Sequence, residues 1–516
     1  MDANAPSTSE GASAGRGGLD QEADRRAKLD RLRDELGVEP FGGRVDGLID
    51  LDTARNQYDP EADHRQKEVG GDDERPHVHI AGRVRLHRVM GNLIFMTLRD
   101  HSGDLQVAVS KKAVDAASFR LAKLLDLGDV VTARGPIGTT KTGEVTVWAT
   151  GEGAVTLACK CLIPPPDKHS GLQDPELRCR MRYADMFANE QVVRTFTLRS
   201  RLVSAIRRFM DERGFLEVET PMLQPVAGGA AARPFVTHHN ALDIPLFLRI
   251  APELYLKRLL VGGLPRVYEI NRNFRNEGID RQHNPEFTSM EVYQAFADYM
   301  TGLELTESLI RHLAFMVSDD GVVEWCGHRI DYAAPFRRVS YGELFEQANG
   351  FAMTDFDRVR QRARELGLRE AGFDDWLVVN AVFEHTAEQG LIQPTFVLDY
   401  PAAISPLTRP RRDDPALCER WDLFIGEMEI GPCYTELNDP DVQEARFREQ
   451  LAGADEEEST FRSLDTDFLE ALRFGMPPAG GLGIGIDRLV MLLSGSRTIR
   501  DVILFPLLRP QESGEG

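Results

Sequence analysis

The sequence predicts an α+β protein, with a small β-barrel near the N-terminus and a larger C-terminal domain of mixed helices and strands. Two observations carry this prediction. Short runs of alternating apolar residues cluster between residues 76 and 160. The region 196 to 510 instead mixes helical apolar spacing with strand-like stretches. A chain of 516 residues is long enough to form several hydrophobic cores.

The composition is that of an ordinary globular protein, with 42% hydrophobic and 28% charged residues. No apolar run approaches the roughly 20 residues that a membrane-spanning helix needs. The N-terminus lacks a basic-then-apolar signal pattern, so we expect a cytoplasmic location. Of the six cysteines, Cys159 and Cys161 form a CxC pair and the others are scattered, which favours incidental thiols over a zinc site or disulfides.

The formal net charge of −21 argues against a broad nucleic-acid surface, because neutralising phosphates usually requires basic residues. A local positive patch is nevertheless sufficient for binding, and an acidic remainder would suppress nonspecific adhesion. The charge alone therefore weakens a nucleic-acid function without excluding it.

Residues 1–75 are expected to form an N-terminal extension, disordered over residues 1–18 and helical from Asp20 to Leu36. Residues 37–75 are expected to be a Gly- and Asp-rich connection. Two interpretations of the basic residues in the helix stay open: contact with a nucleic acid, or ion pairs within a solvated helix. These residues are Arg25, Arg26, Lys28, Arg31 and Arg33.

Residues 76–160 are expected to form a five-stranded OB-fold barrel. The five predicted strands cover residues 78–88, 93–100, 104–110, 129–137 and 144–150, with a helix around Val114 to Leu125 between the third and fourth. Many such barrels bind single-stranded nucleic acids, but small barrels also have other functions. Residues 161–195 begin with prolines, become charged and helical, and are expected to be a linker.

Residues 266–299 predict two strands joined by a polar loop. Because side chains alternate along a strand, Asn273 and Arg275 should share one face of the first strand. Similarly, Phe287, Ser289, Glu291 and Tyr293 should share one face of the second. These strand faces are therefore polar, where apolar core residues could have stood. Such a polar face suits a ligand with a phosphate, a flat base and a cationic group.

Three further stretches are candidates for the same site. The small-residue loop 227–235 is either a linker or a place where backbone approaches a ligand closely. Glu253 follows Pro252 at a helix start, where it either complements the helix dipole or lines a pocket. Glycines recur at every second position from Gly481 to Gly485, which leaves one strand face bare and is not the dinucleotide GxGxxG fingerprint.

The phrases FRNEG and HNPEF within residues 274–287 resemble the second signature motif of class II aminoacyl-tRNA synthetases, closest to the lysyl family. GFLEVETP (214–221) resembles the first motif and GLGIGIDRL (481–489) the third, in matching order and separation. The resemblance implies a class II catalytic domain over 196–510, which is an antiparallel sheet flanked by helices, and a homodimer formed through the helix and strand that end at Pro221. It also implies ATP, Mg²⁺, L-lysine and tRNA(Lys) as cofactor, metal and substrates.

The resemblance assigns roles residue by residue. Arg275 and Arg488 are the implied catalytic residues, and both bind ATP together with Glu277, His283 and Phe287. His283 remains open to interpretation as a solvated loop residue. The implied lysine-binding residues are Gly229, Glu253, Glu291, Tyr293, Tyr434 and Glu436. Asp422 and Glu429 are the implied magnesium ligands. In the barrel, Phe95 would stack on an anticodon base, while Gln106 and Glu144 would read its polar edge.

Two positions depart from the pattern of the family. Pro432 stands where asparagine is usual and offers neither a side-chain hydrogen bond nor an N–H. Asp422 stands where glutamate is usual and is one methylene shorter. Two alternatives therefore stay open: a paralogue that ligates lysine or another amino acid to an acceptor other than tRNA, and a catalytically inactive RNA-binding or regulatory protein. Residues 511–516 are expected to be a tail.

Overall fold

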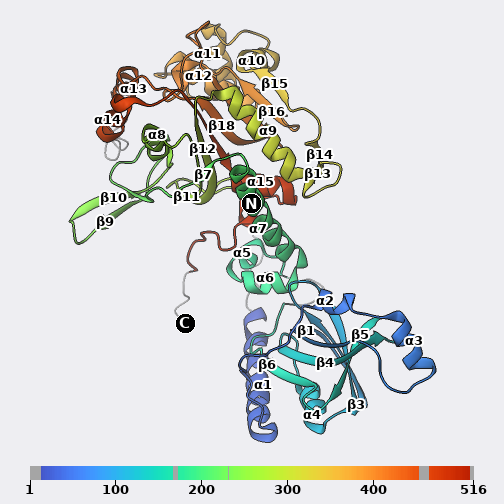
Figure 1. The fold of residues 1–516 in the computed structure, drawn as a ribbon. Helices are drawn as coiled ribbons and strands as arrows, with labels where there is room; N and C mark the ends of the chain where they lie inside the picture. Colours follow the sequence, from blue (N-terminus) through green and yellow to red (C-terminus); the bar gives the residue numbers. More distant parts are fainter. Residues whose placement is uncertain (1–12, 167–171, 231, 453–463, 512–516) are drawn as a thin grey trace, which may run out of the picture. The chain divides into compact units, whose positions relative to one another are not determined.

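The structure is a computed structural model that describes residues 13–166, 172–230, 232–452 and 464–511 (Figure 1). The chain divides into two compact units, Met1–Val193 and Arg194–Gly516. Within the described ranges, no helix is both long and apolar enough to cross a membrane. The expected tail lies outside these ranges from residue 512 onward.

The N-terminal extension is more helical than the sequence suggested. Residues 1–12 lie outside the described residues, and α1 (Ser13–Leu36) begins ahead of the predicted start at Asp20. Adding residues to an existing helix costs little, so poor helix formers can extend it. The expected connection contains α2 (Leu51–Asn56) and α3 (Pro60–Glu68). Asp50 and Asp59 cap the two helices, since their carboxylates accept backbone N–H groups of the first turn.

The helix α1 is not simply solvated. Leu29 and Leu32 are buried, and the Arg25 guanidinium donates to the carbonyl oxygens of Leu127 and Cys161 at 3.0 and 2.9 Å. Elsewhere on α1, Arg26 and Arg31 form ion pairs with glutamates four residues away. Both features favour a structural role for these arginines.

The OB-fold barrel contains the five predicted strands and a sixth. The strands are β1 (His77–Met90), β2 (Leu93–Arg99), β3 (Asp104–Val114), β4 (Val130–Thr139), β5 (Val145–Gly151) and β6 (Val155–Cys159). Their order is β1-β2-β3-β5-β4-β6, and pairing of β1 with β4 closes the barrel. The helix α4 (Ala116–Leu124) lies between β3 and β4, as predicted. We missed β6 because its strand pattern is only five residues long.

Residues after the barrel form α5 (Pro175–Arg180) and α6 (Arg182–Ala188). Arg182 and Asp185 form a buried ion pair at 2.8 Å. The next helix, α7 (Glu190–Asp211), begins within the expected linker 161–195 and continues into the expected catalytic domain.

The second unit is organised around an eight-stranded sheet with the order β15-β16-β17-β18-β19-β12-β11-β7. All neighbouring pairs are antiparallel except β15–β16 and β11–β7. The strands are β7 (Leu216–Glu217), β11 (Arg266–Phe274), β12 (Glu286–Ala295), β15 (Arg337–Ser340), β16 (Thr395–Leu398), β17 (Arg420–Ile425), β18 (Met428–Thr435) and β19 (Ala479–Gly485).

One face of this sheet is covered by apolar helices and the other carries polar groups. The helices α7, α9 (Tyr299–Phe315) and α15 (Ile486–Ser494) pack against the first face. Leu482 and Ile484, which alternate with the glycines, and Ile486, which follows them, are buried in that core. The helix α8 (Glu253–Val261) begins beside Pro252 and packs on β11 and β12 from the other side, with Val267 and Tyr293 in its apolar cluster.

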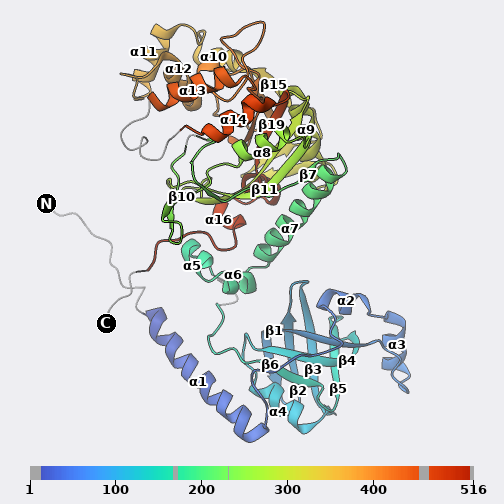
Figure 2. The same cartoon turned by 60° about the vertical axis from the view of Figure 1, so that its left-hand side comes forward.

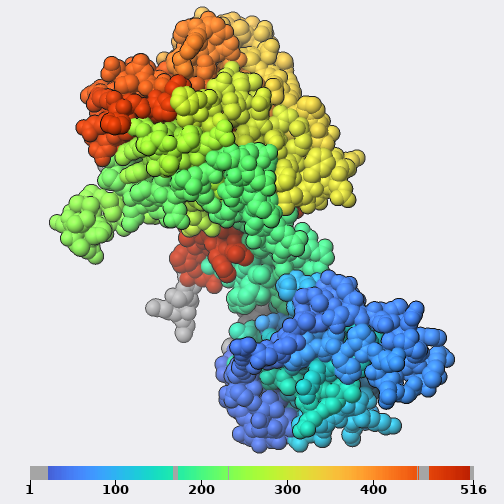
Figure 3. Space-filling model, viewed as in Figure 1, coloured from blue at the N-terminus to red at the C-terminus, as the bar shows by residue number. Residues whose placement is uncertain are grey.

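The remaining elements lie around this sheet (Figure 1, Figure 2). The helices α10 (Tyr341–Asn349), α11 (Phe356–Glu365) and α12 (Asp375–Thr386) form a separate cluster next to β15 and β16. Beyond them are α13 (Pro440–Ala452), α14 (Thr466–Gly475), α16 (Ile499–Val502), the 3₁₀ turn η1 (Ala402–Ile404), the hairpin of β13 (Val322–Trp325) and β14 (His328–Asp331), and a small sheet of β8 (Leu223–Gln224), β9 (Val236–His239) and β10 (Ile244–Leu248). The β9–β10 hairpin projects from its unit at the left of Figure 3.

Candidate active site

The strand register aligns the predicted site residues in rows across the polar face of the sheet. Tyr293 is paired with Gly481, Gly481 with Tyr434, and Tyr434 with Arg420. In the next row, Glu291 is paired with Gly483. Because paired residues point to the same face, side chains from β12, β17 and β18 converge above the glycines of β19.

Other residues of the site cover part of the β19 face on which Gly481 and Gly483 lie. A Cβ on Gly481 would lie 1.9 Å from Glu436 Oε1 and 2.5 Å from the Tyr293 ring. A Cβ on Gly483 would meet nothing closer than 3.9 Å. Gly481 is therefore required for the placement of Glu436, whereas the surface over Gly483 stays open.

Arg275 is the arginine of this site with the greatest free donor capacity. It follows the last residue of β11, and its guanidinium carbon lies 5.1 Å from the centre of the Phe287 ring. Its Nε is buried and has no hydrogen-bond partner within the described part of the chain. Beside it, Asn273 donates to Ser289 at 2.8 Å, so polar residues predicted on the two strands meet on one face of the sheet. A buried donor without a partner is costly, so this position favours an anionic ligand.

His283 joins the loop between β11 and β12 to the helix α15. Its Nε2 lies 2.8 Å from an Arg488 nitrogen, and its Nδ1 lies 2.7 Å from Asp280 Oδ2. Because arginine can only donate, Nε2 accepts and Nδ1 carries the proton that is donated to Asp280. Arg488 also donates to the carbonyl oxygen of Glu429 at 2.6 Å. Glu277 lies in the same loop and is exposed.

Three glutamates and two tyrosines gather at the other end of the site. Glu253 and Glu436 are buried, Glu291 is half-buried, and the Tyr293 hydroxyl donates to Glu291 at 3.2 Å. Burial, and then the negative charge of Glu253, raises the pKa of Glu291 to about 8. Burial raises the pKa of Glu436 to about 7, although the Lys257 ammonium acts in the opposite direction. The negative charges of these three glutamates would be stabilised by a cationic ligand, the kind of ligand that the sequence predicted.

Lys257 is a site residue that the sequence analysis missed. Its ammonium is 2.6 Å from Glu253 and 2.5 Å from Glu436. Burial acts to lower the pKa of Lys257, but the two glutamates outweigh burial and raise it above its ordinary value. The spacing of Glu253 and Lys257, four residues apart on a predicted helix, was the available signal.

Gly229 lies next to the acidic group with a backbone angle that suits only glycine. Its φ is +87°, and a Cβ there would lie 3.2 Å from the Cβ of Ala251 and 3.4 Å from that of Glu253. This contact supports the interpretation of the loop 227–235 as a place of close backbone approach.

The two predicted magnesium ligands differ in their availability. Both carboxylate oxygens of Asp422 accept from the Arg420 guanidinium, at 2.8 and 2.6 Å. The Glu429 side chain is exposed. No group of three or more metal-ligating side chains is found within the described ranges. Since Mg²⁺ often takes only one or two carboxylates and completes its shell with phosphates and water, Glu429 fits a magnesium ligand, whereas Asp422 would have to share its oxygens with Arg420.

The departure at Pro432 is accommodated by the sheet. Pro432 is paired with Asp422 on β17, and the pairing of β18 with β19 begins at Cys433, directly after the proline. On the neighbouring strand, the Arg420 guanidinium lies 5.5 Å from the centre of the Tyr434 ring and 4.2 Å from that of Tyr400. Arg420 therefore helps to orient Tyr434 through cation–π contacts.

In the barrel, two of the three predicted anticodon residues share an outer face. Phe95 and Gln106 are half-buried on the strands β2 and β3, and the core residues Ile94 and Met96 point the other way. Phe95 is paired with the exposed Arg88, which supplies a local positive charge. Glu144 is exposed in the turn before β5.

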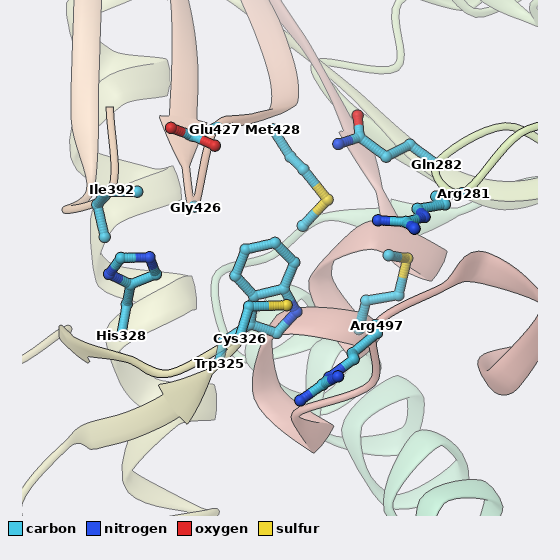
Figure 4. Close-up of a pocket in the computed structure, with 11 residues that line it drawn as sticks. Arg281, Gln282, Trp325, Cys326, His328, Ile392, Gly426, Glu427, Met428 and Arg497 are labelled. Atoms are coloured by element: carbon cyan, nitrogen blue, oxygen red, sulfur yellow. The ribbon is translucent and has the colours of Figure 1, made fainter. Parts of the chain in front are cut away.

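A cavity of about 440 Å³ lies elsewhere in the second unit, and none of the predicted site residues lines it. Its walls come from the β11–β12 loop, the β13–β14 hairpin, the β17–β18 turn and α15 (Figure 4). The predicted site lies instead on the polar face of the eight-stranded sheet.

A sheet with one polar face, with Arg275 directly after β11 and Arg488 in the helix that follows β19, is the arrangement expected of a class II synthetase. Comparison with known families supports that interpretation: a model described as tRNA synthetases class II (D, K and N) matches residues 174–509, and an OB-fold nucleic acid binding domain matches residues 78–152. The chain belongs to this class II tRNA synthetase family.

Individual relatives narrow the comparison further. A lysine–tRNA ligase of Carboxydothermus hydrogenoformans is 46% identical over 498 residues, covering 95% of this chain and 98% of that protein. One from Pelotomaculum thermopropionicum is 47% identical over 496 residues, covering 95% and 94%. The heat-inducible lysine–tRNA ligase of Escherichia coli is 44% identical over 501 residues, covering 96% and 97%.

Proposed function

We propose that this chain is a lysine–tRNA ligase, which activates L-lysine with ATP and transfers it to the 3′ end of tRNA(Lys). The observation that carries the proposal is the group of Glu253, Glu291 and Glu436 beside the open face over Gly483, with an arginine donor free for phosphate at the other end. An elongated cation with a carboxylate at one end fits this distribution of charge. Relatives with this activity in their names match nearly the whole chain.

The first step needs no general base, because the lysine carboxylate is already a nucleophile. One carboxylate oxygen attacks the α-phosphorus of ATP, and the bond to the pyrophosphate oxygen breaks. Arg275 binds the α-phosphate and the carboxylate with its planar fork and stabilises the charge that develops at phosphorus. In the second step the 3′-terminal ribose hydroxyl of the tRNA attacks the carbonyl carbon of the adenylate, and AMP leaves.

The remaining nucleotide contacts are assigned to residues around Arg275. Phe287 and Arg488 hold the adenine between a ring and a guanidinium group, while Glu277 and His283 contact ATP. The hydrogen bonds of Arg488 to His283 and to the backbone of Glu429 support this role, because they fix the guanidinium before ATP arrives.

Lysine is held between backbone and acidic side chains. Gly229 approaches the α-amino group, and Glu253, Glu291 and Glu436 with the hydroxyls of Tyr293 and Tyr434 select the cationic side chain. Neutral analogues are rejected, because they would leave buried polar groups unpaired.

Mg²⁺ would be held by Glu429, with Asp422 as the second carboxylate, and would neutralise charge on the phosphates of ATP. The exposed Glu429 carboxylate supports the first assignment. The second requires Asp422 to keep its ion pair with Arg420 while it binds the metal.

The proposed domains are an extension over 1–75, an anticodon-binding barrel over 76–160, a linker over 161–195 and a catalytic domain over 196–510. Phe95 stacks on an anticodon base, and Gln106 and Glu144 read its edge. Dimerisation through α7 and the following segment is supported by the exposed side chains of Leu216, Met222 and Leu223. We expect the homodimer to act in the cytoplasm.

The decisive experiment is amino-acid-dependent ATP–pyrophosphate exchange with the twenty amino acids, ornithine and β-lysine, followed by charging of a tRNA(Lys) transcript. Exchange with lysine and a charged tRNA are expected. Exchange with another amino acid would overturn the lysine assignment. Exchange with lysine but no charging would favour the paralogue with another acceptor, and absence of ATP binding would favour the inactive RNA-binding protein.

A further inference from the structure

The helix α8 places a buried cation inside the acidic group. The Lys257 side chain is 0% exposed, as is that of Glu436, and the side chain of Glu253 is 8% exposed. The ammonium contacts Glu253 Oε1, one helical turn away, and Glu436 Oε2, which belongs to the segment after β18. Lys257 therefore connects two parts of the site that are far apart in the sequence.

The ion pairs leave part of each carboxylate for another ligand. Lys257 uses one oxygen of each glutamate, and the other Glu436 oxygen is buried and has no hydrogen-bond partner within the described ranges. That oxygen lies over Gly481, on the glycine face of the sheet. A carboxylate held at one oxygen and free at the other is oriented in advance for a second cation.

We propose that Lys257 is a positioning residue that holds Glu253 and Glu436 at a fixed separation and so selects the length of the diamino acid. This inference rests on the proposed function. Because Lys257 holds Glu253 Oε1 and Glu436 Oε2 at 2.6 and 2.5 Å from one ammonium, it fixes the point at which the site receives the cationic end of the substrate side chain. Six-carbon lysine reaches that point, whereas the side chain of five-carbon ornithine is one methylene shorter. Without Lys257 the two glutamates would repel each other and lose this spacing.

The same arrangement makes the site sensitive to pH. The charged and titratable groups around Lys257 are Glu253 on α8, Glu291 and Tyr293 on β12, Tyr434 on β18, and Glu436; Arg275 and Arg420 are the nearby guanidinium groups. Removal of the ammonium would raise the pKa of Glu436 further, because the Lys257 charge is what opposes the effect of burial, and a protonated carboxyl binds a substrate ammonium poorly.

The test uses Lys257→Met and Lys257→Arg in the full-length protein, with pyrophosphate exchange measured for lysine and for ornithine. We expect Lys257→Met to raise the KM for lysine by about tenfold or more at pH 7.5, with kcat and the KM for ATP changed much less. The ratio of lysine to ornithine, meaning kcat/KM for lysine divided by kcat/KM for ornithine, should fall. The KM for lysine should partly recover at pH 9.

Lys160→Met is a matched control. Lys160 is also 0% exposed and also bridges two carboxylates, Asp126 at 2.6 Å and Asp129 at 2.8 Å, but it lies in the other unit. This variant should lower the melting temperature without changing the KM for lysine or the ratio of lysine to ornithine. A fall in that ratio in both variants would show a general loss of stability and would overturn the proposal.

If Lys257→Met does not fold, Lys257→Arg decides the question. The guanidinium keeps the charge but is wider, so the ratio of lysine to ornithine should still fall while the KM for ATP stays near that of the unmodified protein. An unchanged ratio in every folded Lys257 variant overturns the inference. The unmodified protein tests the proposed function separately: if it uses another amino acid, the variants are compared on that substrate and on its homologue shorter by one methylene.

Discussion

Arg275 differs from the other arginines of the site because its Nε has no hydrogen-bond partner within the described residues. Arg488 is fixed by His283 and by the Glu429 carbonyl, and Arg420 is fixed by Asp422. A guanidinium near the reacting atoms that is not engaged elsewhere can bind a phosphate without first breaking an ion pair. The structure therefore favours Arg275 as the residue that stabilises the transition state.

Arg275→Ala should lower the rate of lysine-dependent pyrophosphate exchange by about 100- to 1000-fold, because one transition-state donor of this kind typically has that effect. Arg281→Ala, in the same loop but beside the separate cavity, is the control and should change the rate by less than about threefold. Equal losses in both variants would show that the loop, rather than the Arg275 guanidinium, is responsible.

The raised pKa values of Glu291, about 8, and Glu436, about 7, predict pH-dependent lysine binding. Below pH 7 both carboxyls are largely protonated, and the site loses the charge that attracts an ammonium. The Kd for lysine should therefore fall by about tenfold between pH 6 and pH 8.5. Titration calorimetry in buffers of different ionisation enthalpy should also detect proton release on binding. A Kd independent of pH would contradict these protonation states.

At the scale of elements, β18 carries both Tyr434, one of the residues proposed to select lysine, and Pro432, which departs from the family pattern. Its register places Tyr434 beside Gly481 and Arg420, while Pro432 stands before the pairing with β19 begins. The proline is therefore compatible with the sheet, and its effect should be on substrate contacts rather than on folding.

Pro432→Asn should lower the KM for lysine by about fivefold, the effect of one additional hydrogen bond of roughly 1 kcal/mol. Exchange kinetics with lysine would measure this effect. Pro432→Ala restores the N–H without a side-chain amide and should leave the KM near that of the unmodified protein. If both variants behave alike, the amide makes no contact with the substrate.

At the scale of the whole molecule, the two units should contribute to separate steps. Phe95 and Gln106 lie on the barrel, whereas the residues assigned to activation belong to the second unit. Activation of lysine requires only small molecules, and so it should not depend on the barrel.

Phe95→Ala should raise the KM for tRNA by roughly tenfold or more, because one base–aromatic stack contributes about 1–3 kcal/mol. Pyrophosphate exchange in the same preparation should be unchanged. Ile94→Ala on the opposite face of β2 is the structural control, since a buried core truncation should lower the melting temperature instead. A loss of exchange in Phe95→Ala would contradict the separation of steps.

Local patterns predicted much of the architecture. The alternation within residues 266–299 correctly predicted two paired strands, and polar residues that it placed on these strands meet at the hydrogen bond between Asn273 and Ser289. The helices α2 and α3 were missed, because each is shorter than the window over which helical periodicity is informative. The strand β6, which follows the five strands expected of the barrel, was also missed.

The sequence by itself determined the fold class, the family and the residue types of the site, because strand alternation, glycine spacing and motif order are local properties of the chain. Only the tertiary structure showed that Lys257 lies between Glu253 and Glu436, and that Arg420 occupies both oxygens of Asp422. Such pairings depend on the register of strands and on the packing of α8 against the sheet. Burial then decides which charges need a partner, because desolvation makes an isolated charge costly only where water is excluded.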